Sequence, residues 1–199
     1  YEGSEDDISE GYTKNPHWVG PWPTTICNSM TAESMIVEFH EITDLTCMWR
    51  ACPKPCLSPY VPWYLGNLAV PCGYEWTDPL IAQTTHFCPA EEELRYNPAR
   101  AYWAFRTLQY LTEFDYGMPA KLIHPAIAEI EKEWVAEKPL VEETYKKLLD
   151  KNEKAAKEYL TQYTAGKAAF AWNWANDMIQ KVGEERILDN NPTVRALYE

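Results

Sequence analysis

The chain lacks the sequence patterns on which several common activities depend. It contains no Gly-rich phosphate loop and no G-x-S-x-G motif, so the signatures of phosphate-binding and serine hydrolase sites are missing. Its four histidines are scattered, and none lies in an H-x-x-x-H or H-E-x-x-H pattern. No apolar run approaches the length that spans a bilayer, and no signal peptide opens the chain. No complete catalytic set is visible, and we expect neither a metal nor another cofactor.

Basic side chains are also few. The 18 Lys and Arg residues stand against 30 Asp and Glu residues, which gives a formal net charge of −12 at pH 7. Nucleic acids and anionic membranes would repel such a chain, so we expect neither as a partner. The carboxylates of residues 1–26 lack the spacing of a calcium loop, and this favours a solvated surface segment with turns.

The chain is instead rich in apolar and aromatic residues. Aliphatic, aromatic and cysteine residues make up 46% of its 199 residues, enough for one buried core or one core plus a helical layer. The nine Trp and thirteen Tyr residues could serve a core, a ligand pocket or an interface, and composition does not separate these uses.

Six cysteines lie in the first half of the chain, and their redox state stays open. An even number permits up to three disulfides, whereas buried free thiols behave as small hydrophobes. Cys52 and Cys56 are separated by two prolines and a lysine and have no matching second pair, so their spacing does not favour zinc. The six are Cys27, Cys47, Cys52, Cys56, Cys72 and Cys88.

Residues 33–66, ESMIVEFHEITDLTCMWRACPKPCLSPYVPWYLG, predict two strands and then an aromatic, proline-broken loop. Side chains alternate between two faces from Ser34 to His40 and again from Leu45 to Arg50. The short link at 42–44 favours an antiparallel pair. Glu38 and His40 share one strand face, which is either part of a site or a solvated edge. The loop that follows exposes rings at the end of a sheet, a common place for a binding site.

The chain is predicted to be loop-rich from 66 to about 96 and helical from Asn97 onward. The first of four predicted helices has Asn97 as its N-cap, carries an apolar stripe from Ala101 to Leu111 and ends at Gly117. A second carries a stripe from Ile123 to Trp134, with a kink or late start at a proline, and a third opens at Pro139. A fourth runs from about 152 to 182. The expected fold class is α+β, a single domain or part-domain with strands and loops in 1–96 and a helical layer in 97–199.

Several segments, taken in order, resemble the C69 family of dipeptidases, formerly called U34. YEGSEDDISEG at the start resembles that family's YEGT-x-x-D-x-x-x-G segment, and the GPW at 20–22 resembles its G-P-F/W turn. ESMIVEFHEI, Trp49 and SPYVPWY are similar to its strand pair and S-x-Y-x-P-x-Y loop. NPARAYWAFRTLQYLTEFDYG resembles its Y-W-x-F-R helix, and 151–163 its last long helix. The resemblance covers roughly 1–185.

The resemblance implies an N-terminal-nucleophile (Ntn) hydrolase fold, with two stacked sheets between helical layers. In that family the N-terminal Cys is both thiolate nucleophile and α-amine base, and an α-amine titrates near neutrality. None of the six cysteines here matches the nucleophile position, so no catalytic residue is assigned to this chain. The resemblance implies an N-terminal Cys-bearing segment or subunit as partner. Glu38 and His40 stand where the family tends to have Gln and Arg, which bears on substrate preference.

Two hypotheses follow. In the first, the chain is the C-terminal part of a thiol-dependent dipeptidase or amidohydrolase acting on a small peptide or amide, in a possible oligomer. In the second, it is a non-catalytic binding or structural module. The resemblance to the C69 family and the cysteine-rich loops favour a secreted or periplasmic location over a cytoplasmic one. The candidate substrate-binding residues, each of which could instead be ordinary packing or surface, are Glu38, His40, Arg50, Ser58, Tyr60, Trp63 and Tyr64.

Overall fold

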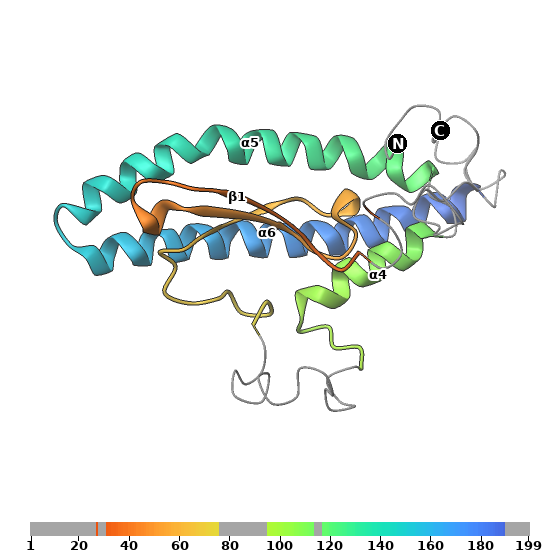
Figure 1. Cartoon of the computed structure of the whole chain (residues 1–199). Helices are drawn as coiled ribbons and strands as arrows, with labels where there is room; N and C mark the ends of the chain where they lie inside the picture. Colours follow the sequence, from red (N-terminus) through yellow and green to blue (C-terminus); the bar gives the residue numbers. More distant parts are fainter. Residues whose placement is uncertain (1–26, 28–30, 76–94, 114–116, 190–199) are drawn as a thin grey trace.

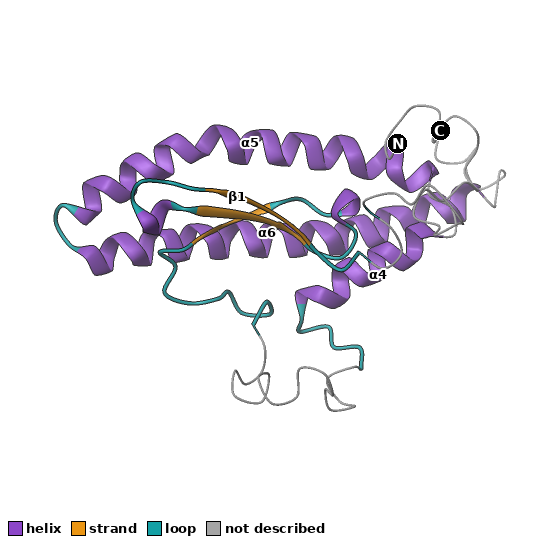
Figure 2. Ribbon diagram, viewed as in Figure 1, coloured by secondary structure: helices purple, strands orange, loops and turns teal. Residues whose placement is uncertain are grey.

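The computed structural model describes residues 27, 31–75, 95–113 and 117–189. Within these ranges the fold is α+β: a small antiparallel sheet lies against two long helices that run side by side, and a shorter helix packs at one end (Figures 1 and 2). The predicted surface segment at 1–26 and the sixth cysteine, Cys88, lie outside the described residues.

The predicted antiparallel strand pair is confirmed. Strands β1 (Ser34–Glu38) and β2 (Cys47–Ala51) pair so that Ser34 lies opposite Ala51 and Glu38 opposite Cys47. The link between them is longer than a tight hairpin because it contains a single 3-10 turn, η1 (Thr43–Leu45). Leu45, the last residue of the turn, has a fully buried side chain that holds the turn against the core.

A third strand, β3 (Val61–Tyr64), lies where the sequence predicts only a loop, so that prediction was wrong. Within the described residues the strand order is β1-β2-β3, which makes β3 an edge strand. Proline is tolerated on an edge strand because its missing N–H need not face a neighbour, and Pro62 pairs with Trp49 there. The β-branched and aromatic residues around the proline favour the extended backbone.

The first helix, α4 (Ala101–Glu113), begins later than predicted, and the residues that follow it, 114–116, lie outside the described residues. The Asn97 side chain accepts a hydrogen bond from the Ala99 N–H, so it caps the turn before the helix. Gly117 was predicted to end this helix and instead begins the next one. The predicted apolar stripe is confirmed, because every third or fourth residue of α4 is buried against α6; the buried residues include Ala101, Ala104, Phe105 and Leu108.

The predicted second and third helices are one continuous helix, α5 (Gly117–Leu149), so the predicted four-helix layer was wrong: the described residues contain three α-helices. Pro125 and Pro139 both lie inside α5. Each proline removes a backbone hydrogen bond, which ordinarily ends or kinks a helix. The helix continues here because its buried stripe extends past both prolines and packs against α6. The residues of this stripe are Ile123, Ile127, Trp134, Val141 and Tyr145.

Helix α6 (Glu153–Asp189) is the central element of the core. It begins close to the predicted position, and its N-terminus is capped by Asn152, whose side chain accepts a hydrogen bond from the Ala155 N–H. It packs against α4, α5 and β3, which is possible because small side chains on its buried face allow close approach. These are Ala156, Ala168, Ala171 and Ala175, all fully buried.

Polar bonds from the loops fasten the sheet to the helices. The Tyr145 hydroxyl of α5 donates to Asp44 in η1 over 2.6 Å, and Lys157 of α6 lies 3.5 Å from the same carboxylate. In the loop after β3, the Tyr74 hydroxyl donates to the Ala168 carbonyl of α6 over 2.9 Å. Bonds of this kind fix which part of each helix faces the sheet.

Candidate functional site

The sheet divides the predicted site residues between its two faces. Strand register places Glu38, Cys47 and Tyr64 side by side on one face. We call it the helix face, because Glu38 lies near Lys138 of α5 and Tyr64 lies near Tyr163 of α6. The opposite face, which we call the outer face, is formed by Met35, Val37, Met48, Arg50, Val61 and Trp63. The seven predicted residues therefore do not form one pocket.

Arg50 and Trp63 are the two predicted residues that the outer face brings together. The Arg50 guanidinium carbon lies 5.7 Å from the centre of the Trp63 ring, within the range of a cation–π contact. The Arg50 Nε donates to a carboxylate oxygen of Glu33 over 2.8 Å, and both side chains are nearly half exposed. Trp63 also makes an edge-to-face contact with the Tyr74 ring, at 5.5 Å between centroids. The outer face thus presents a positioned, partly exposed cation.

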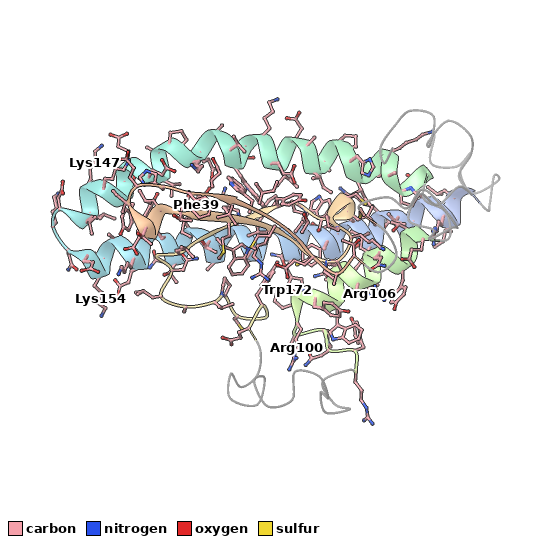
Figure 3. All side chains as sticks on the ribbon, viewed as in Figure 1. Phe39, Arg100, Arg106, Lys147, Lys154 and Trp172 are labelled. Carbon is pink, nitrogen blue, oxygen red and sulfur yellow. The ribbon has the colours of Figure 1, made fainter. Side chains whose placement is uncertain are left out.

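The same face is apolar and exposed along β1. Met35 and Val37 of this strand are 52% and 36% exposed, and Phe39 just beyond it is 89% exposed. Figure 3 shows Phe39 at the end of the sheet that lies near the turn between α5 and α6. Within the described residues β1 pairs with β2 alone, so its second edge has no strand beside it. An apolar strand with an open edge is a surface that pairs readily with another strand.

Glu38 faces the helices rather than a cavity. One of its carboxylate oxygens accepts the indole N–H of Trp49 over 2.5 Å, and the other lies 3.6 Å from Lys138 Nζ of α5. Lys138 also pairs with Glu142 over 2.7 Å, so the three form a short chain of charged side chains from β1 to α5. These bonds hold β1 against the helix, and they give Glu38 a positioning role in the described structure.

Tyr60 and Tyr64 also belong to the helix face. The Tyr60 hydroxyl donates to the Ser34 Oγ over 2.7 Å, and the Tyr60 N–H donates to Glu131 of α5 over 3.0 Å. Tyr64 is buried with its ring 6.2 Å from that of Tyr163, and burial raises the pKa of the Tyr64 hydroxyl well above its usual range. A phenol in this environment stays protonated and donates hydrogen bonds rather than acting as a base.

Ser58 and His40 lie away from both faces. Ser58 follows the short 3-10 turn η2 (Pro55–Leu57), is fully buried, and donates its hydroxyl proton to the Cys52 carbonyl over 3.0 Å. His40 lies in the turn after β1, where its Nδ1 accepts the Ile42 N–H over 2.8 Å. Both side chains therefore stabilise local backbone in the described structure.

Two thiols near the sheet, Cys47 and Cys52, are poorly suited to attack a carbonyl. Burial, reinforced by the Glu38 carboxylate, raises the pKa of Cys47 to about 12. Burial likewise raises the pKa of Cys52 to about 12. Because the thiolate is the nucleophilic form, neither residue supplies one at neutral pH. No cluster of three metal-ligating side chains occurs among the residues that the structure describes. Nor, within that part of the chain, is any helix long and apolar enough to cross a membrane.

One surface depression lies between α5 and α6 and includes none of the predicted site residues. It has a volume of about 440 Å³ and is lined by Glu133, Trp134, Glu137, Gln162, Tyr163, Gly166, Lys167 and Phe170. Lys167 Nζ lies 2.6 Å from Glu137 and between two rings, 5.5 Å from Trp134 and 5.3 Å from Tyr163. The chain's own lysine thus occupies an aromatic cage. Tyr163 and Lys167 are four residues apart on one helix, a spacing that could have indicated the contact.

The comparisons with known proteins add no family to these observations. No protein-family model matches the chain, and neither a curated protein nor a solved structure is similar enough to count as a match.

Proposed function

We propose that this chain is part of a thiol hydrolase of the Ntn class. More particularly, we propose that it is the C-terminal portion of a C69-type dipeptidase or amidohydrolase whose N-terminal Cys nucleophile lies on another segment or subunit. The sequence resemblance suggests the class. The exposed apolar edge of β1, beside the positioned Arg50, is the observation that carries the proposal, because it fits a missing strand next to a substrate-binding cation.

The proposed occupant of the outer face is the Cys-bearing segment, with one of its strands paired to β1. This pairing would satisfy the open edge of β1 and remove the exposed apolar side chains from water. Cys47 and Cys52 are protonated at neutral pH, which is consistent with a nucleophile supplied from elsewhere. In the proposed site, the α-amine of the N-terminal Cys takes the thiol proton and the thiolate attacks the peptide carbonyl.

Arg50 is the proposed anchor for the substrate. A guanidinium binds a carboxylate through paired, charge-assisted hydrogen bonds, and a dipeptide always carries a free carboxylate. Trp63 beneath the guanidinium and Glu33 beside it restrict its orientation, so little side-chain entropy would be lost on binding. Glu38, His40, Ser58, Tyr60 and Tyr64 would then act behind the site, by holding the strands and loops that position Arg50.

The proposal is tested by expressing the chain together with the upstream coding sequence of its gene. We expect dipeptide hydrolysis that iodoacetamide blocks and that survives Cys→Ser substitution at each cysteine of this chain. Arg50→Met should raise KM roughly 10- to 100-fold, because the substrate loses a hydrogen bond to a charged group. Lys132→Met, on an exposed part of α5, should leave KM unchanged. If replacing one of this chain's cysteines abolished activity, the nucleophile would lie within this chain and our proposal would be wrong.

The strand-pairing step has its own test. Met35→Lys places a charge on the exposed apolar edge and should prevent association with the Cys-bearing segment, as measured by co-purification and native mass spectrometry. Leu140→Lys makes the same change at an exposed site on α5 and should leave association intact. A stable 23.1 kDa monomer with no bound segment and no hydrolase activity would favour the non-catalytic binding module instead.

A further inference from the structure

A second group of reactive side chains lies apart from the outer face, around the loop between β2 and β3. The sulfur atoms of Cys27 and Cys56 are 3.3 Å apart, although 29 positions separate the two residues in the sequence. Cys27 is buried and Cys56 is partly exposed. A disulfide bond is about 2.0 Å long, so the two sulfurs would need to approach by about 1.3 Å. A movement of this size is within the reach of side-chain rotation.

Lys54 is the third member of the group. Its side chain is fully buried, and its ammonium nitrogen lies 3.9 Å from a carboxylate oxygen of Glu113 at the end of α4. Burial lowers the pKa of Lys54, while negative charge on Cys27, Glu113 and Cys56 acts in the opposite direction. The same attraction operates in reverse, because a buried ammonium stabilises a neighbouring thiolate.

The backbone at Lys54 is unusual in a way that supports a function here. The residue lies between two prolines and has a φ of 51°, the left-handed region that residues other than glycine rarely adopt. A non-glycine residue is held in this conformation only where its surroundings enforce it, and such positions cluster at functional sites. The conformation places the lysine inside the loop instead of in solvent, as its complete burial shows.

We propose that Cys27 and Cys56 are a reversible redox pair that forms a disulfide by exchange with a small-molecule disulfide such as oxidised glutathione. The disulfide would join the segment before β1 to the loop that carries η2 and Ser58. Cys56 is the more exposed thiol, so its thiolate attacks first and forms a mixed disulfide as one glutathione thiolate leaves. The Cys27 thiolate then attacks the Cys56 sulfur and releases the second glutathione. The protein loses two electrons and two protons, and the glutathione disulfide is reduced to two thiols.

This pair is independent of the proposed hydrolase activity, since neither thiol attacks substrate. The other thiols give a contrast within the same chain. Burial raises the pKa of Cys52 to about 12, and that residue is only four positions from Cys56. Cys52 is therefore the matched control: it shares the loop but lacks the reactivity that we assign to Cys56.

The proposal is tested by incubating the whole protein in buffers of oxidised and reduced glutathione, then alkylating and mapping its peptides by mass spectrometry. We expect one cross-linked product joining Cys27 to Cys56, with the mass loss of two hydrogens, in wild type and in Cys52→Ser. Cys56→Ser should abolish this product. Oxidation in concentrated urea should instead give mixed pairings, because the folded structure selects the partner. Pairing of Cys56 with Cys52, or full alkylation of both Cys27 and Cys56 after treatment with oxidised glutathione alone, would overturn the proposal.

The contribution of Lys54 is measured separately, through the pH dependence of the exchange rate. Lys54→Met should slow reaction with oxidised glutathione at pH 7 by roughly threefold for each unit by which the thiol pKa rises, because a tenfold smaller thiolate fraction is partly offset by a more nucleophilic thiolate. The difference should narrow at pH values where the thiols ionise without help. Circular dichroism serves as the control for folding of the variant. An unchanged rate and pH profile would overturn the assignment of Lys54 as the residue that activates the pair.

Discussion

Gly73 is a position where one added methyl group should damage the fold, and its effect can be worked out from the structure. Gly73 lies in the loop after β3 with a φ of +84°, and its carbonyl accepts the first N–H of α4, from Ala101. Its neighbour Tyr74 packs between the rings of Trp63 and Trp172. The glycine thus holds the loop that supports Trp63 on the outer face.

Gly73→Ala should destabilise the protein through two effects. A side chain in left-handed backbone costs about 1–2 kcal/mol. The new Cβ would lie 2.4 and 2.8 Å from two carbon atoms of the Trp172 ring, so the ring or the loop must move. Overpacking of this kind costs about 1–3 kcal/mol. The expected loss in the free energy of unfolding is therefore about 2–5 kcal/mol.

Urea denaturation followed by tryptophan fluorescence and circular dichroism measures this loss. Gly183→Ala is the matched control, because Gly183 lies inside α6 and an added Cβ would meet no atom within 4 Å. Alanine has the higher helix propensity, so the control should gain about 0.5–1 kcal/mol. Equal stability of Gly73→Ala and wild type would refute the reasoning about the loop.

Two further predictions concern bonds between the sheet and α5. Tyr145→Phe removes the hydroxyl that donates to Asp44 and should lower the free energy of unfolding by about 1–3 kcal/mol in the same denaturation assay; no change would mean that Lys157 alone secures that carboxylate. Burial raises the pKa of Glu131 above its unfolded value, although the Tyr60 N–H opposes this, so the folded state binds the extra proton. The Glu131 carboxyl therefore contributes stability below its unfolded pKa that is lost as pH rises through its folded pKa. The free energy of unfolding of Glu131→Gln should lack this pH dependence, so it should rise relative to that of wild type between pH 4 and pH 7. Parallel pH profiles of the two proteins would contradict the assignment.

The sequence predicted those features that local periodicity reports. Two-residue alternation indicated the pairing of β1 with β2, and the spacing of apolar residues indicated the buried stripe of α4. The start of α6 was predicted close to its observed position, because the Asn152 cap is a local interaction. Such patterns record which side of an element is buried, and this depends on residues within one or two turns.

The continuity of α5 and the existence of β3 could not be predicted in this way. Pro139 is a reliable local signal for the start of a helix, and Pro62 for a break in a strand. In the folded chain, packing against α6 offsets the lost hydrogen bond of Pro139, and the edge position of β3 accommodates Pro62. Tertiary contacts override local preference in both places, since several buried side chains outweigh one missing bond.

The sequence by itself determined the fold class, the strand pair and the residues that could supply a site. Only the tertiary structure decided how those residues are grouped: Arg50 with Trp63 on the outer face, Glu38 and Tyr64 under the helices. It also decided that Cys27 meets Cys56 across 29 positions. The physical reason is that side chains alternate between the two faces of a strand, and this alternation does not indicate which face the helices cover. That choice is made by the burial of apolar surface between elements distant in the sequence.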